Sequence, residues 1–139
     1  MNTTSNDIQK WVKCFNDKFL EFMNELINTF PDDKDFKLFK QSFNMLKLVD
    51  DNKPLQLFRV HASVYKSQIL NNDEDFFLKH NFEDELQIVQ NININANSNF
   101  SNELMIKLKQ YWVDLTTENK KTVWSYLTLL YKINDKICI

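Results

Sequence analysis

The sequence predicts an all-α protein, and three observations favour that fold class. Gly is absent from the 139 residues and Pro occurs twice, whereas the tight turns of β-hairpins usually need Gly. Hydrophobic residues make up 43% of the chain, which is enough to build a core. Apolar residues also recur at steps of three and four along most of the chain. We therefore expect a single helical domain over residues 1–139, a compact bundle of about five helices, four of them long.

The first predicted helix runs from about Asn6 to Phe30 and has one broad apolar face. That face comprises Ile8, Trp11, Val12, Phe15, Phe19, Phe22, Met23, Leu26, Ile27 and Phe30. Ser5 or Asn6 can cap its start, since a short polar side chain accepts a hydrogen bond from an unpaired amide there. Pro31 disfavours helical dihedral angles at the residue before it and so predicts the end of this helix.

A second helix is expected to start at Pro31 or Asp32, because proline fits the first turn of a helix. Its predicted buried stripe is Phe36, Phe39, Phe43 and Leu46. The polar residues 50–52 break the pattern, and Pro54 restarts it for a third helix that we expect to reach about Leu70. Short helical turns should follow the acidic cluster that begins at Asp73.

The helical period fails near residues 81–100, where we expect one polar loop, although residues 91–95 alternate as a short strand would. Ser101 is predicted to cap a fourth long helix, and Thr116 or Thr117 a last one. The fourth helix carries Leu104, Leu108, Tyr111, Trp112 and Leu115. The last carries Val123, Trp124, Leu127, Leu130, Tyr131 and Ile133.

Three phrases of the sequence stand out: Phe30-Pro31-Asp32 with Phe36-Lys37, the run from Asp73 to Leu78, and the run from Trp112 to Leu127. Together they resemble short uncharacterised proteins of giant nucleocytoplasmic DNA viruses, of the mimivirus or phycodnavirus kind. The resemblance implies a viral origin and a setting in the host cytoplasm or in a virion. It brings no activity with it, so it implies no catalytic residue.

The composition excludes several kinds of site. Phosphate-binding loops and the nucleophile elbow of hydrolases need glycine, and this chain has none. The candidate metal ligands His61, His80, Cys14 and Cys138 do not have the spacing of a zinc site. We expect His61 and Cys14 to be core or boundary residues, and His80 to complement a helix end. The acidic cluster Asp73–Asp75 is expected to start a helix and not to bind a cation. Together with the missing glycine and the missing zinc spacing, this predicts no metal and no cofactor.

Charge and hydropathy argue against nucleic acid and membranes as partners. The nearest approach to a basic aromatic stripe is Lys107, Lys109, Lys120 and Lys121 around Tyr111 and Trp112. The chain nevertheless has one arginine and a net charge of −2. No apolar run approaches the roughly 18 residues of a membrane span. With two cysteines and no apolar leader at its start, the sequence predicts a cytoplasmic protein.

The aromatic content suggests a binding surface. Twelve Phe, three Trp and four Tyr are more than a domain of this size easily buries. The candidate partner-binding residues are Trp11, Phe76, Phe77, Trp112 and Trp124. We therefore expect a non-enzymatic helical module that binds another protein or itself, as a virion component or as a binder of host or viral factors. The alternatives are an enzyme with a site of scattered side chains and a nucleic-acid-binding accessory protein.

Overall fold

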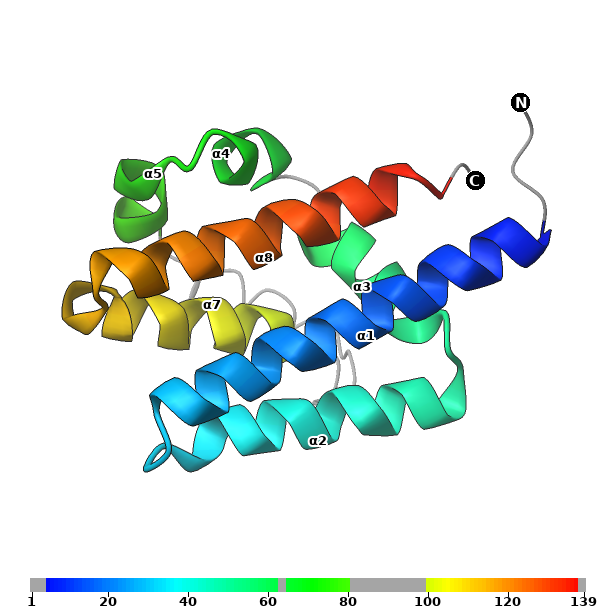
Figure 1. Ribbon diagram of the computed structural model, residues 1–139, viewed down its shortest axis with the longest axis horizontal. Helices are drawn as coiled ribbons and strands as arrows, with labels where there is room; N and C mark the ends of the chain where they lie inside the picture. The colour runs from blue at the N-terminus through cyan, green and yellow to red at the C-terminus, as the bar shows by residue number, and fades with distance from the viewer. Residues whose placement is uncertain (1–4, 63–64, 81–99, 138–139) are drawn as a thin grey trace, which may run out of the picture.

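The computed structural model describes residues 5–62, 65–80 and 100–137, and every regular element in these ranges is helical (Figure 1). The prediction of an all-α protein is confirmed. These ranges hold seven α-helices and one 3-10 turn, where the sequence predicted about five helices. The predicted polar loop lies outside the described residues as far as residue 99.

The first two helices pack side by side and are joined by a short turn. Helix α1 spans Ser5–Thr29 and helix α2 spans Lys34–Val49 (Figure 1). The predicted start of α2 at Pro31 or Asp32 is wrong by two or three residues. Asp33 caps the helix instead, because its Oδ1 accepts a hydrogen bond of 2.9 Å from the amide of Asp35.

The predicted third helix is divided into two. Helix α3 spans Lys53–Ala62 and packs against α1, α2 and α7, whereas helix α4 spans Lys66–Leu70 and packs against α8. Helices α3 and α4 therefore cover different parts of the core, which a single straight helix could not do. Helix α5, Glu74–Lys79, follows a turn in which Asn72 has φ of 51°. Asparagine tolerates this left-handed conformation in a chain without glycine.

The last described elements are helix α7 (Phe100–Tyr111), the 3-10 turn η3 (Trp112–Asp114) and helix α8 (Thr117–Asp135). Ser101 lies inside α7 and does not cap it, because α7 already begins at Phe100. Trp112 lies in η3 and not in the preceding helix as predicted. The prediction for Thr116 is confirmed, since its Oγ1 accepts a hydrogen bond of 3.0 Å from the amide of Asn119.

The core lies where α2 and α8 pack against α1. The predicted buried stripe of α2 is confirmed at Phe36, Phe39 and Phe43, and Leu46 is half-buried. The ring of Phe43 stacks on that of Phe19 in α1, with 4.5 Å between ring centres. Helix α2 forms one edge of the molecule, at the bottom of the view in Figure 1. Its aromatic face is therefore covered by the bundle, whereas Leu38, Met45, Leu48 and Val49 on the same helix are exposed.

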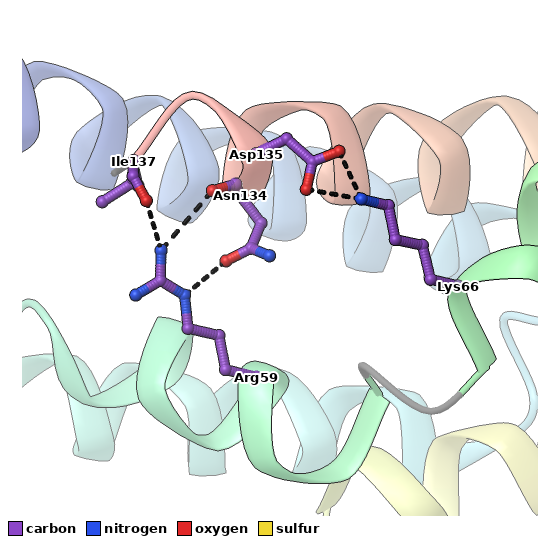
Figure 2. Close-up of polar contacts among 5 residues, drawn as sticks. All are labelled: Arg59, Lys66, Asn134, Asp135 and Ile137. Atoms are coloured by element: carbon purple, nitrogen blue, oxygen red, sulfur yellow. Dashed lines mark hydrogen bonds and ion pairs between the residues drawn. The ribbon is translucent and has the colours of Figure 1, made fainter. Parts of the chain in front are cut away.

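The sole arginine of the sequence fastens the end of α8 to α3 (Figure 2). Nε of Arg59 donates a hydrogen bond of 2.6 Å to Oδ1 of Asn134, and Nη2 donates one of 2.9 Å to the main-chain oxygen of Ile137. The last carbonyl groups of a helix have no partner within it, so the guanidinium supplies what the helix end lacks. Beside it, Nζ of Lys66 lies 2.7 Å from Asp135 Oδ2 in an exposed ion pair.

Candidate functional site

Three of the five aromatic residues predicted to bind a partner form a buried cluster. The ring centre of Trp112 lies 5.2 Å from that of Phe77 and 5.3 Å from that of Trp124, both in edge-to-face geometry. The side chains of Phe77, Trp112 and Trp124 are 2%, 1% and 8% exposed. Their predicted role in partner binding does not fit this burial. They contact one another in the interior and join α5, η3 and α8.

The other two predicted residues, Trp11 and Phe76, are half-buried and pack against the core. The ring of Phe76 stacks on that of His80 with 5.0 Å between ring centres, and it also contacts Tyr65. Edges of these two aromatic side chains reach the surface, but neither side chain belongs to an exposed apolar patch. The large apolar side chains that are exposed lie elsewhere, several of them on α2.

Helix α2 carries large apolar side chains on a face that points away from the core. We name this set the α2 stripe: Leu38, Met45, Leu48 and Val49. Their exposed fractions are 53%, 54%, 87% and 80%. Single exposed leucines are common in proteins, but four apolar side chains that share one helix face form a patch of the kind that marks binding surfaces.

Helical geometry explains why these residues share a face. The spacing from Leu38 to Met45 is seven residues, which is close to two full turns, and Leu48 and Val49 follow one turn later. The aromatic residues Phe36, Phe39 and Phe43 lie on the opposite side and fill the interior. Helix α2 is thus apolar on two faces, and one of them has no cover within the described bundle.

Charged residues of both signs lie at each end of this helix. Lys34 and Lys37 are exposed at its amino-terminal end, where Asp35 lies in the first turn. Asp50 and Asp51 are exposed just beyond its carboxyl end, where Lys47 lies in the last turn. The α2 stripe is therefore bordered by mixed charge at both ends.

A polar cluster holds the amino-terminal end of α2 against α7. Nζ of Lys107 lies 3.0 Å from Oδ2 of Asp33 and 2.8 Å from Oδ2 of Asp35. The hydroxyl group of Tyr111 donates a short hydrogen bond to the same Oδ2 of Asp33. This cluster fixes the orientation of α2, and with it the direction in which the α2 stripe faces.

The charges in this cluster stabilise one another. Burial acts to raise the pKa of Asp33, but hydrogen bonds from Tyr111, the Asp35 amide and Lys107 together hold it below its usual value. Hydrogen bonds to Asp35 and Asp33 raise the pKa of Lys107.

A groove runs beside the cluster, between α2 and α7, and is lined in part by Leu38, Ser42 and Glu103. Burial, and then the charge of Asp35, raise the pKa of Glu103.

His80 is held by aromatic and polar contacts. Its Nε2 lies 3.0 Å from the hydroxyl oxygen of Tyr65, and Lys109 donates a hydrogen bond of 2.7 Å to its main-chain oxygen. Burial, followed by the charge of Lys109, lowers the pKa of His80. His80 is the residue that ends α5, so its predicted place at a helix end is confirmed. The lowered pKa disfavours the charged form of the ring at that end.

The remaining candidate metal ligands lie only in part within the described residues. Cys14 is a free, half-buried thiol, and Cys138 and the side chain of His61 lie outside what the structure describes. Within the described ranges, no three His, Cys, Asp or Glu side chains gather in a way that could hold a metal ion. No helix in those ranges combines the length and the apolar character needed to cross a membrane.

Comparison of the chain with protein-family models, with curated proteins and with solved structures finds no match in any of the three.

The α2 stripe is aliphatic, whereas the sequence pattern favoured aromatic residues as binding candidates. A signal for it was present: Leu38, Met45, Leu48 and Val49 fall outside the predicted stripe Phe36, Phe39, Phe43 and Leu46, yet share a face with each other. A helix with two separate apolar faces has one more than a single core contact needs.

Proposed function

We propose that this protein is a non-enzymatic protein-binding module whose docking surface is the α2 stripe. The observation that carries the proposal is the exposure of four large apolar side chains on one face of a helix at the edge of the bundle. Covering apolar surface is favourable by about 25 cal/mol per Å². The anchoring of α2 through Lys107 and Asp33 holds this face in place, so that little order is lost on binding.

The acid–base properties of the polar cluster support a structural role for it. General acids and bases work best when their pKa lies near the pH of the reaction. The pKa of Asp33 is lowered and that of Lys107 is raised, so both shifts lead away from neutral pH. This pattern stabilises fixed charges at the start of α2, the helix that carries the proposed docking surface.

The contacts of the lysines argue similarly against nucleic acid as the partner. Lys107 is paired with two carboxylates, Lys109 donates to a main-chain oxygen, and Nζ of Lys120 lies 5.5 Å from the centre of the Trp112 ring. Three of the four lysines that formed the predicted basic stripe are thus engaged within the protein. A phosphate backbone would have to compete with these contacts.

The proposal extends to the setting of the protein. The resemblance to giant-virus proteins rests on the phrases quoted above, and it makes the host cytoplasm or a virion the proposed place of action. A partner there would be a second copy of this chain, a viral protein or a host factor.

A photo-crosslinking residue at position 48 tests the docking surface. In cells that naturally contain the protein, we expect Leu48 replaced by benzoylphenylalanine to cross-link a protein that mass spectrometry can identify. The purified partner should then bind the wild-type chain and bind a Leu48→Lys variant at least tenfold more weakly. The matched control is the same residue at Val113, which is 77% exposed but lies in η3. Equal cross-linking from both positions, or none from position 48, would contradict the proposal.

A further inference from the structure

We infer that a hollow between α1 and the turn after α2 binds a small zwitterion that carries N–H donors, which is the chemistry of a free amino acid. The hollow has a volume of about 330 Å³, at the lower end of the range of small-molecule sites. It is lined in part by Lys13, Asn16, Asp17, Lys47 and Asp51. It shares no residue with the α2 stripe, so this inference and the proposed function are separate.

A buried amide in the lining points to a ligand with a hydrogen-bond donor. Asn16 is only 2% exposed, and its Nδ2 donates a hydrogen bond of 3.0 Å to the main-chain oxygen of Asp51. Its Oδ1 has no hydrogen-bond partner in the part of the chain that the structure describes. A buried acceptor without a partner costs free energy, and a ligand that donates an N–H group to Oδ1 would remove that cost.

The hydrogen bond to Asp51 decides which end of the Asn16 amide needs a partner. The nitrogen must face the Asp51 carbonyl group, because two oxygen atoms at that distance would repel each other. The group left over is therefore an acceptor, which only a donor can satisfy. Oδ1 has almost no surface open to water, so the exposed side chains of the lining, such as that of Lys13, must shift as the ligand enters.

Charges of both signs line the hollow without pairing with one another. Lys13 and Asp17 are four residues apart on α1, as are Lys47 and Asp51 at the end of α2, and opposite charges at this spacing can pair along a helix. Within the described ranges, none of these four side chains takes part in an ion pair. The neighbouring Asp50 is engaged elsewhere, since its Oδ1 accepts a hydrogen bond of 2.9 Å from a main-chain amide of the turn. Two cations and two anions are therefore available to a ligand.

A free amino acid matches this lining better than a ligand with one sign of charge. Its carboxylate would lie between Lys13 and Lys47, which belong to different helices, while its ammonium group would donate to Oδ1 of Asn16 and face the aspartates. A simple anion would meet the two aspartates, and a simple cation would meet the two lysines. The unpaired acceptor adds a second requirement, because a zwitterion without N–H groups leaves Oδ1 without a partner.

Titration of the isotope-labelled chain with glycine, followed by NMR, tests the inference. Glycine should cause saturable shifts of the Asn16 side-chain amide and of main-chain amides near Lys13 and Lys47, with a dissociation constant on the order of 1 mM. Betaine, the trimethylated form of glycine, carries the same two charges but no N–H group, and it should bind at least tenfold more weakly. A hollow that holds only water would give no saturable shift with glycine or with any other free amino acid. That result, or equal affinity for glycine and betaine, would overturn the inference.

Substitution of an exposed lysine tests the site without disturbing the core. Lys13→Met should weaken glycine binding severalfold, because it removes one of the two cations that would hold the carboxylate. Lys132→Met removes the same charge from an exposed residue of α8 outside the hollow, and it should bind glycine as the wild type does. Equal losses in the two variants would show that the shifts report net charge alone and would overturn the inference. Circular dichroism of each variant confirms that the helices are retained.

Replacement of Asn16 tests the donor contact itself. Leucine keeps a similar branched shape but has no acceptor, so Asn16→Leu should bind glycine and betaine with equal affinity. A preference for glycine that persists in this variant would overturn the contact with Oδ1. If circular dichroism shows that Asn16→Leu does not fold, the betaine comparison and Lys13→Met still decide the inference. Leu48→Lys, which alters the α2 stripe, should bind glycine as the wild type does, so failure of one proposal is distinguished from failure of the other.

Discussion

The hydroxyl group of Tyr111 donates a hydrogen bond to Oδ2 of Asp33, a residue 78 positions earlier in the sequence. The same carboxylate caps α2 through its other oxygen. One side chain therefore fixes the start of α2 and its attachment to α7 at once.

Removal of the tyrosine hydroxyl should alter the acidity of Asp33. Hydrogen bonding from Tyr111 is the largest of the effects that lower the Asp33 pKa, so we expect Tyr111→Phe to raise that pKa towards its usual value. Carbon-detected NMR titration of the Asp33 carboxyl group measures the change. Tyr126→Phe removes a hydroxyl group that is bonded to Glu21 instead and should leave the Asp33 titration unchanged.

The same carboxylate should make stability depend on acid pH. The pKa of Asp33 is lower in the folded protein than in the unfolded chain, where it is about 3.9. The contribution of ionised Asp33 to the free energy of unfolding is therefore fully present above a pH of about 4. It is lost as the pH falls through the pKa that Asp33 has in the folded protein. Asp33→Asn keeps a capping side chain but removes the charge. We expect this variant to be less stable than the wild type at pH 7 and closer to it at about pH 2, as measured by urea unfolding.

Core packing at Phe43 can be compared with exposure at Leu48 on the same helix. Phe43 is 0% exposed and stacks on Phe19, so Phe43→Ala should lower the free energy of unfolding by about 3–5 kcal/mol. Leu48 is 87% exposed, and Leu48→Ala should change it by less than about 0.5 kcal/mol when measured on the monomer. Similar losses at both positions in chemical denaturation would contradict the orientation of α2.

The clamp formed by Arg59 should depend on the guanidinium group. Lysine cannot reproduce its two separate donors, so Arg59→Lys and Arg59→Ala should both lower the free energy of unfolding, by about 1–3 kcal/mol. The neighbouring exposed pair offers a contrast. Lys66→Ala breaks the contact with Asp135 and should change stability by less than about 1 kcal/mol. Thermal unfolding that ranks Lys66→Ala as the more damaging change would contradict this account.

Tyr126 should ionise late in an alkaline titration. Burial, and then its hydrogen bond to Glu21, raise the pKa of Tyr126 to about 12. The neutral form is favoured in the folded state, so its contribution is present below the unfolded pKa of about 10 and is lost as the pH rises through about 12. Since the pKa values of Tyr111 and Tyr131 are also raised, the step of Tyr126 is obtained as the difference in tyrosinate absorbance between the wild type and Tyr126→Phe. A difference that titrates near pH 10 before unfolding would contradict the half-buried, hydrogen-bonded geometry of Tyr126.

Local rules account for most of the helix positions that the sequence predicted. Thr116 and Asp73 are capping residues because their side chains can accept a bond from a nearby amide, and such signals need few neighbours to be recognised. The aromatic stripe of α2 follows from the helical period alone. The division between α3 and α4 depends on which part of the core each covers, and that information is not local.

The candidate surface was less predictable than the fold. Trp112 and Trp124 have the residue type of a binding hot spot, but a large aromatic ring is equally suited to a core, and pattern does not separate the two uses. Whether Leu38 or Leu48 is covered depends on which neighbours the bundle places beside α2. The ion pairs of Lys107 join residues more than 70 positions apart and leave no trace in a local pattern.

The packing of α1 against α8 has a consequence for how the protein is made. The ribosome releases α1 long before it has synthesised α8, so the apolar face of α1 stays open to water while the intervening chain emerges. The nascent chain therefore exposes Phe22 during that interval, because this side chain is buried in the folded protein with its ring stacked on Tyr126 of α8. Such a segment is a natural client for chaperones that bind nascent chains, and slow translation of the last helix would prolong its risk of aggregation.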